Sequence, residues 1–180
     1  MEKIYDEAGA EAKVLRDMQE LVSEIRKLTE HDPVTVDTGS LQLRVIRMSV
    51  AEDLNQIQHE YLILRGIRWL IDKGFGSDIE WEWNPRQTGS ANEPDLRGKR
   101  GGTVIVSAEG TASESPIGKV DQRMQQTLEK LSRFEGQKFY FVATAIMEQR
   151  AKTKVAKAGW AIRVVCCECG TKQAHATAGV

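Results

Sequence analysis

Apolar residues recur every three or four positions near the start of the chain, which predicts a long amphipathic helix. The spacing runs from Glu7 to Thr29 with charged residues between the apolar ones, as is typical of a helix that packs along one side. Four of the apolar positions also fit a 3-4-3 seam: Leu15, Met18, Val22 and Ile25. Two interpretations stay open, a helix packed on its own domain and a helix that pairs with a second copy. We assign residues 1–32 to an N-terminal helical arm used for packing or dimerisation.

The helical pattern breaks at Pro33, which marks a linker. Residues 41–50 then alternate apolar and basic side chains well enough for a strand, although they could equally be the stiff start of the next helix. Ser49, with Glu52 three residues later, matches a capping box. We expect a helix to follow it as far as about Lys73, where glycines stop it.

The rest of the chain predicts alternating strands and helices. Expected strands lie at 78–84, 94–98, 102–112, 138–146 and 160–168, and expected helices at 119–134 and 147–158. Such an order predicts an α/β sandwich around one central mixed sheet, built from residues 40–170. We expect the small and polar residues 171–180 to form a flexible tail.

Size and composition describe an ordinary globular domain. The chain has 180 residues, of which 41 % are hydrophobic and 28 % charged. It contains no apolar run of the ~20 residues that a spanning helix needs, and no hydrophobic signal region at its start. We therefore expect a cytoplasmic protein without a membrane partner. Because the net charge is −1, any nucleic-acid surface would have to be a local patch.

Candidate chemistry is carried by two carboxylates, Asp95 and Glu109, at the outer ends of two predicted strands. The two side chains come together if these strands pair across the turn GKRGG. Two converging carboxylates need a positive partner, and Mg²⁺ bound by one or two carboxylates with water and phosphate is a common one. Such an ion supports phosphodiester hydrolysis. The alternative is two solvated acids at the ends of a hairpin.

With Glu60 on the preceding helix, Pro94-Asp95 and Glu109 follow one another in the order of a known motif. From about Glu52 to Val165 the chain resembles the PD-(D/E)xK superfamily, which includes restriction endonucleases, DNA-repair nucleases and Holliday-junction resolvases. The resemblance implies a restriction-endonuclease-like α/β/α sandwich. It also implies that Asp95 and Glu109 hold Mg²⁺ or Mn²⁺, that Glu60 is an additional metal ligand, and that DNA is the substrate.

One departure from the motif concerns its lysine, because Thr111 stands where the resemblance requires it. A substitute could come from Lys119 or Gln125 on the following helix, or from Lys99. A degenerate member that does not cut is the alternative. His59, the neighbour of Glu60, points about 100° away on the helix, and we interpret it as incidental.

Two basic segments are candidate nucleic-acid contacts. Arg97, Lys99 and Arg100, with the glycines of the turn, could approach a phosphate backbone, or could simply keep an exposed loop soluble. Arg150 and Lys152 belong to a second basic run, which continues through Lys154 and Lys157. It could flank a duplex, although the solvated face of a helix is the simpler interpretation.

A cysteine cluster near the end of the chain invites a zinc interpretation. Cys166, Cys167 and Cys169, with His175 nearby, lack the two-residue gap of a zinc knuckle, and no second pair exists. A strand with buried, reduced cysteines explains them better.

These observations favour a Mg²⁺-dependent DNA endonuclease of restriction or repair type, working as a homodimer. The alternative is a catalytically inactive protein of the same fold that binds nucleic acid or another protein. A small-molecule enzyme on an unrelated α/β fold is the weakest candidate, because the sequence has neither a phosphate-binding loop nor a nucleophile motif.

Overall fold

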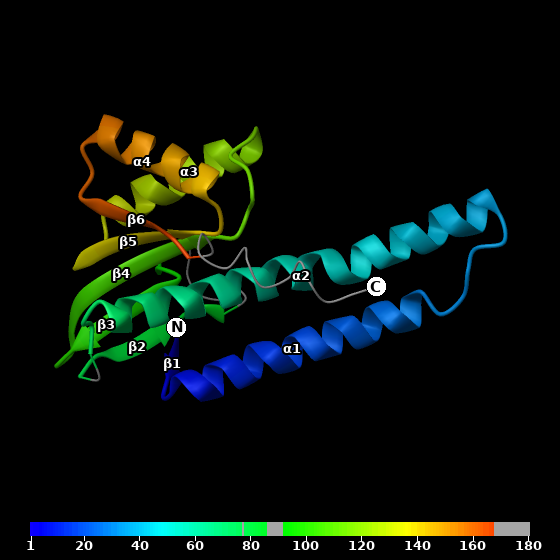
Figure 1. The fold of residues 1–180 in the computed structure, drawn as a ribbon, viewed down its shortest axis with the longest axis horizontal. Helices are drawn as coiled ribbons and strands as arrows, with labels where there is room; N and C mark the ends of the chain where they lie inside the picture. The colour runs from blue at the N-terminus through cyan, green and yellow to red at the C-terminus, as the bar shows by residue number, and fades with distance from the viewer. Residues whose placement is uncertain (77, 86–91, 168–180) are drawn as a thin grey trace, which may run out of the picture.

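A computed structural model of the chain describes residues 1–76, 78–85 and 92–167. In this part of the chain, six strands form one mixed sheet and four helices surround it (Figure 1). The strands are β1 (Glu2–Ile4), β2 (Glu80–Trp83), β3 (Leu96–Arg100), β4 (Thr103–Thr111), β5 (Gln137–Val142) and β6 (Ile162–Cys166). The helices are α1 (Glu7–Leu28), α2 (Val36–Asp72), α3 (Lys119–Ser132) and α4 (Ala145–Ala158).

The spatial order of the strands is their order in the chain, β1 to β6. Neighbours from β1 to β4 pair antiparallel, whereas β4, β5 and β6 are parallel. Helices α3 and α4 make the two crossovers that parallel strands require. The apolar β4 lies in the interior of the sheet, as its sequence predicts.

Each face of the sheet is covered by a helical layer, so the predicted α/β class is confirmed. Phe139 and Phe141 of β5 point into the core under α2, and the alternate residues Tyr140 and Val142 point into the core under α3 and α4. This two-sided burial is the reason that β5 has an almost continuous apolar sequence.

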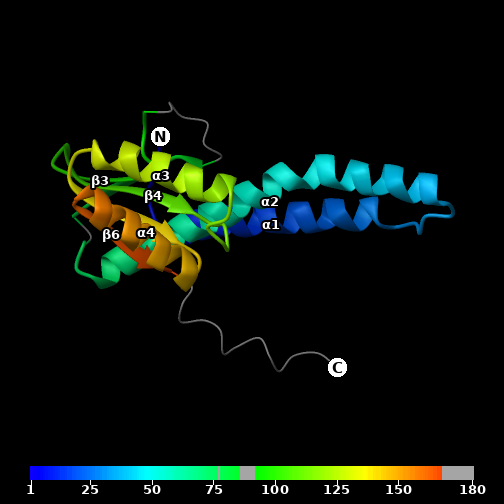
Figure 2. The ribbon, with the colours of Figure 1, turned by 90° about the horizontal axis from the view of Figure 1, so that it is seen from above.

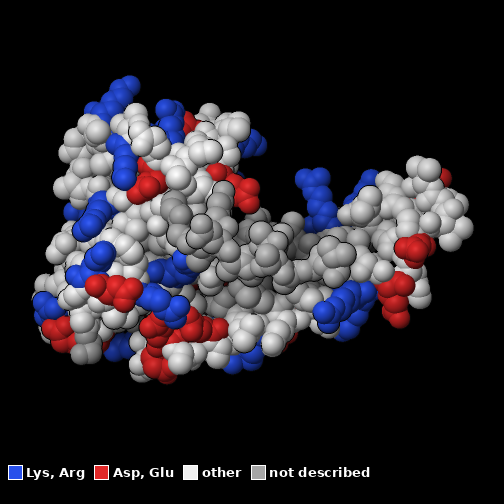
Figure 3. All heavy atoms as spheres, viewed as in Figure 1, with Lys and Arg blue, Asp and Glu red and all other residues white. Residues whose placement is uncertain are grey.

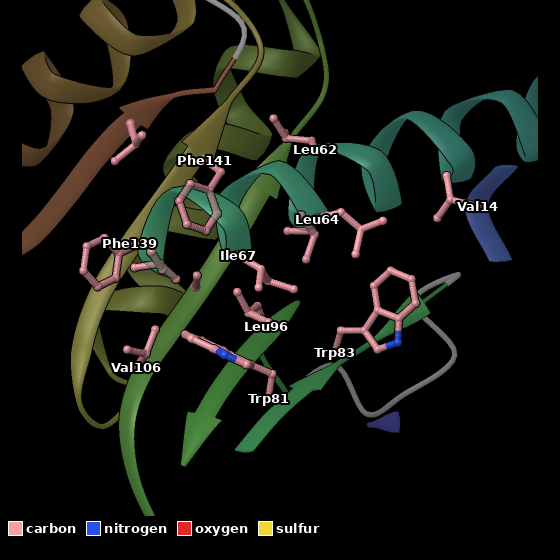
Figure 4. Close-up of a cluster of buried hydrophobic side chains, with 14 of the residues drawn as sticks. Val14, Leu62, Leu64, Ile67, Trp81, Trp83, Leu96, Val106, Phe139 and Phe141 are labelled. Carbon is pink, nitrogen blue, oxygen red and sulfur yellow. The ribbon is translucent and has the colours of Figure 1, made fainter. Parts of the chain in front are cut away.

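Helix α2 packs on the sheet through its second half, where Ile67 lies over Leu96 and Leu62 lies near Phe141 (Figure 4). The close approach depends on Gly66, because a Cβ at that position would lie 2.5 Å from the ring of Phe141. This contact fixes the half of α2 that carries the candidate acid Glu60.

The first half of α2 and the second half of α1 extend together past the sheet and past the other helices (Figures 1 and 2). They are joined at the far end, where the side-chain amide of Gln42 donates hydrogen bonds to the backbone carbonyls of Leu28 and His31. Despite the length of α2, no helix among the described residues is both long and apolar enough to cross a bilayer.

The predicted strand at 41–50 is wrong, and the alternative of a stiff helix start is correct. Residues 41–50 belong to α2, which begins at Val36 under a capping box formed by Thr35 and Thr38. The predicted capping box at Ser49 is therefore wrong as well. The misassignment has a physical cause, since apolar residues at 41, 45 and 48 also follow helical spacing.

Three smaller features also differ from the prediction. Strand β1 was not predicted; it is three residues long and pairs only with β2 among the described strands. The strand predicted at 138–146 ends at Val142, and Thr144 caps the next helix. The predicted N-terminal helix is confirmed, with Asp6 as its cap. The predicted tail at 171–180 lies outside the described residues.

Candidate active site

Pairing of β3 with β4 brings the two predicted carboxylates together. Leu96 lies opposite Ala108 in the ladder, so Asp95 and Glu109 occupy the next step, at the same end of the two strands. Both are buried, with 6 % and 5 % of their surface exposed. The predicted hairpin across Gly101 is confirmed, and the alternative of two solvated acids is excluded by their burial.

Asp95 is held by three elements. His59 Nε2, from α2, lies 3.0 Å from Asp95 Oδ2, and the backbone N–H of Gly110, on β4, donates to the same oxygen at 2.9 Å. The backbone N–H of Asn84, after β2, donates to the carbonyl oxygen of Asp95 at 2.9 Å. The carboxylate is therefore fixed in place.

Gly110 allows α2 to approach this closely. A Cβ at position 110 would lie 2.8 Å from Ile63 Cδ1 and 3.6 Å from His59 Nε2. The absence of a side chain between Glu109 and Thr111 leaves room for the contact between His59 and Asp95.

Asp95 and His59 each favour the charged form of the other. Burial by itself raises the pKa of Asp95, but the charge and hydrogen bond of His59, with the Gly110 N–H, hold this pKa below its ordinary value. Burial likewise lowers the pKa of His59, but the charge and hydrogen bond of Asp95 raise it above its ordinary value. Nδ1 of His59 is buried and has no hydrogen-bond partner among the described residues.

Glu109 is the less satisfied acid. Burial, and after it the negative charge of Asp95, raise the pKa of Glu109 to about 8. Lys130 opposes this shift, with its Nζ 2.8 Å from Glu109 Oε1 and 2.8 Å from the backbone carbonyl of Glu93, to which it donates. The contact with Glu109 is a close ion pair without hydrogen-bond alignment, since Oε1 has no aligned donor among the described residues. Lys130 therefore offsets only part of the cost of burying a charged Glu109.

Glu60 is buried instead of solvated, with only 1 % of its surface exposed. Lys13 of α1 contacts it at 2.8 Å and also contacts Asp17 at 2.8 Å. The Lys13 ammonium lies 5.6 Å from the centre of the Trp83 ring. A lysine thus occupies the position beside Glu60 that a metal ion would need.

The side chains of this site include possible Mg²⁺ ligands but no complete metal centre. No cluster of three or more Asp, Glu, His or Cys side chains is arranged as a ready metal centre in the described part of the chain. Asp95 and Glu109 nevertheless fit the one or two carboxylates that usually bind Mg²⁺ together with water and phosphate. A divalent ion could bind the pair once Glu109 has lost its proton. Glu60 could join them only after it leaves Lys13.

Two residues of this site, His59 and Lys130, were not identified from the sequence. The interpretation of His59 as incidental is wrong, because the structure bonds it to Asp95. Lys130 lies eleven residues beyond Lys119 on α3, which places the two on nearly the same face of the helix but about 16 Å apart along it. Helical spacing from Lys119 was the available signal for Lys130.

The predicted substitutes for the motif lysine are not brought to the carboxylates. Lys119 is exposed at the first position of α3, and Gln125 lines a groove of about 400 Å³ between α3 and α4. Lys99 contacts Glu82 at 2.8 Å. Thr111, at the motif position, forms a 2.7 Å hydrogen bond with the hydroxyl of Tyr140.

The candidate nucleic-acid contacts are engaged with acids. Arg97 and Lys99 lie within β3, not on the turn, and both contact Glu82, while Arg100 contacts Asp78. On α4, Arg150 contacts Asp121 at 2.7 Å and Lys152 contacts Glu148 at 2.8 Å. Lys, Arg, Asp and Glu are intermingled on the face that Figure 3 shows. Each of the five predicted cations thus contacts at least one acid.

The prediction of buried, reduced cysteines is wrong for Cys166, which is disulfide-bonded and partly exposed. The zinc interpretation of the cluster gains no support either. Cys166 is the last residue of β6, and Cys169 and His175 lie outside the described residues.

Comparison of the chain with protein-family models, with curated proteins and with solved structures finds no match.

Proposed function

We propose that the protein is a metal-dependent endonuclease of the PD-(D/E)xK superfamily, with a restriction-endonuclease-like fold and DNA as its substrate. The observation that carries the proposal is the buried pair of Asp95 and Glu109 at one end of β3 and β4, with Lys130 2.8 Å from Glu109. Perturbed pKa values in such a pair are typical of functional sites. The burial of Glu60 on α2, the helix that precedes these strands, also supports the proposal.

In this proposal Asp95 and Glu109 bind Mg²⁺ or Mn²⁺, and Glu60 is an additional ligand once Lys13 releases it. The ion would polarise the scissile phosphate and lower the pKa of the attacking water. His59 and the Gly110 N–H position Asp95 and keep it ionised. Glu109 must lose its proton to bind the ion, so metal binding and deprotonation of Glu109 are coupled.

Lys130 takes the role of the missing motif lysine. Its ammonium lies 2.8 Å from Glu109, which is two residues before the motif position Thr111 on β4. A cation in this place offsets the negative charge that develops on the phosphate during attack. The lysine comes from α3 instead of β4, and Thr111 is free to hydrogen-bond with Tyr140.

The alternative function is a catalytically inactive member of the same superfamily that binds nucleic acid or protein. Thr111 at the motif position favours it, as does the pairing of every predicted DNA-contacting cation with an acid. The two functions predict different results for purified protein: the enzyme cleaves DNA when metal is present, whereas the inactive member binds DNA or protein without cleaving DNA.

The test is nicking of supercoiled plasmid by purified protein with Mg²⁺ or Mn²⁺. We expect Asp95→Ala and Glu109→Ala to abolish nicking, and Lys130→Met to reduce it on the order of 100-fold or more. Lys119→Met is the matched control on the same helix face and should retain activity within a few fold. DNA binding by the same proteins is measured in parallel, with circular dichroism to show that each is folded.

Metal-dependent nicking by wild type, and not by Asp95→Ala or Glu109→Ala, supports the proposal that the protein is a nuclease. Folded wild-type protein that binds DNA without cutting it supports the inactive module. Equal nicking by wild type and Asp95→Ala would contradict the proposed site.

A further inference from the structure

The helical hairpin, which we define as residues 15–54 of α1, α2 and the turn between them, carries most of the large apolar side chains that are exposed in the described part of the chain. Leu15 and Val22 of α1 are 54 % and 46 % exposed, and Leu43 and Leu54 of α2 are 69 % and 44 % exposed. Apolar patches of this extent usually mark an interaction site.

These four side chains lie on one side of the two helices, whereas the exposed Leu41, Val45 and Met48 lie on the opposite side of α2. Ion pairs identify the sides, because Arg68 of α2 contacts Glu7 and Glu11 of α1 on one side, and Lys13 contacts Glu60 on the other. On α1, Leu15 lies four residues after Glu11, and Val22 lies seven residues after Leu15. On α2, successive steps of seven, seven and eleven residues back from Arg68 lead to Tyr61, Leu54 and Leu43. Helical spacing therefore places all five on the Arg68 side, and we call them the apolar face.

The width of the apolar stripe on α1 exceeds what α2 covers. Val14 and Leu21 are buried against α2, while their neighbours Leu15 and Val22 remain exposed. Three apolar positions in seven are typical of a helix in a bundle, whereas a two-helix pair needs only two. The helical hairpin thus has the apolar pattern of one half of a four-helix bundle.

We propose that a second copy of this chain packs on the apolar face and forms an antiparallel four-helix bundle. The first argument is the symmetry of α1 about the point between Met18 and Gln19. A two-fold axis there places Leu15 opposite Val22 of the second copy, and Glu11 opposite Arg26 of the second copy. A C₂ interface requires a surface that complements itself in this way.

The same axis also aligns α2. Lys13 contacts Glu60 and Gln42 contacts the carbonyl of Leu28, so Leu54 lies at about the level of Met18. Leu54 of each copy therefore lies near the axis and meets its equivalent. The copies overlap over about 20 residues of each helix, a face roughly 30 Å long and 20 Å wide. That is comparable to the roughly 800 Å² per partner of a specific complex.

The test is the molar mass of the protein in solution, measured by light scattering after gel filtration without DNA or metal. We expect twice the 20.1 kDa of the chain, and one chain mass for Val22→Glu and for Leu54→Glu. Met48→Glu is the matched control. Met48 is 77 % exposed on α2 but lies outside the apolar face, so this variant should remain a dimer.

Cysteine cross-linking keeps the test valid if the glutamate variants do not fold. Leu54→Cys should give a covalent dimer on mild oxidation, because the two residues at the axis are within disulfide reach. Met48→Cys and wild type report the background from the native cysteines. A monomeric wild type, equal disruption by Met48→Glu, or equal cross-linking of Leu54→Cys and Met48→Cys would overturn the proposal. The measured quantity is mass, so the result does not depend on the proposed nuclease activity.

Discussion

The two halves of α2 differ in burial, and each departs from the usual rule that apolar residues are buried and polar residues exposed. From Val36 to Ser49 no residue is buried, although this half contains Leu41, Leu43 and Met48. From Ile57 to Leu70 most residues are buried, and they include charged and polar ones. Burial in this helix is decided by what packs on it and not by residue type. The buried half therefore needs partners for its polar groups, which Lys13 and Asp95 supply, and the exposed half retains apolar surface.

The largest expected effect on folding is the loss of a charge partner in the buried half. Lys13→Met removes the lysine that contacts Glu60, and breaking a buried ion pair is strongly destabilising. We expect the free energy of unfolding to fall by about 3 kcal/mol at pH 7. Urea denaturation measures it, and Lys27→Met, an exposed lysine on the same helix, should change it by less than about 0.5 kcal/mol. Equal effects of the two substitutions would show that Glu60 does not depend on Lys13.

A glycine in each half gives the same substitution in two environments. Gly66→Ala forces a Cβ against the ring of Phe141, 2.5 Å away, and such overpacking costs about 1–3 kcal/mol. Gly39→Ala brings a Cβ to 3.1 Å from Pro33 Cβ and gains helix propensity, so we expect a change of less than about 1 kcal/mol. Thermal unfolding of both variants measures the difference. A Gly39→Ala variant less stable than Gly66→Ala would contradict the described packing.

The smallest expected effect is the pH dependence that Glu109 imposes. Its pKa in the folded protein is about 8, against 4.5 for an ordinary glutamate. Between these pH values the folded protein retains a proton that the unfolded chain has lost, so Glu109 lowers stability as pH rises from about 4.5 to about 8. Glu109→Gln removes this decline.

Urea midpoints at pH 5 and pH 6, with chelator present, test the pH dependence of Glu109. We expect the variant to gain on the order of 1 kcal/mol over wild type between the two values. Parallel pH profiles for wild type and Glu109→Gln would mean that Glu109 titrates normally.

Part of the site could be predicted because it is local. Asp95 and Glu109 lie on strands joined by a short turn, so hairpin pairing is enough to bring them together. His59 and Lys130 come from α2 and α3, and their contacts depend on how these helices pack, which sequence spacing does not determine. The same limitation explains β1, whose three residues are a strand only because β2 lies beside them. It also explains the partner of Glu60, since Lys13 lies 47 residues away.

The measurement that tests the central claim most directly is Mn²⁺ binding, followed by electron paramagnetic resonance at pH 6.5 and pH 8.5. If Asp95 and Glu109 form a metal site, wild type binds Mn²⁺ more tightly at pH 8.5, because the proton on Glu109 competes with the ion. The double variant Asp95→Asn with Glu109→Gln should lose this binding, while Glu148→Gln, on the exposed surface of α4, should keep it. Equal Mn²⁺ binding by wild type and the double variant would contradict the account.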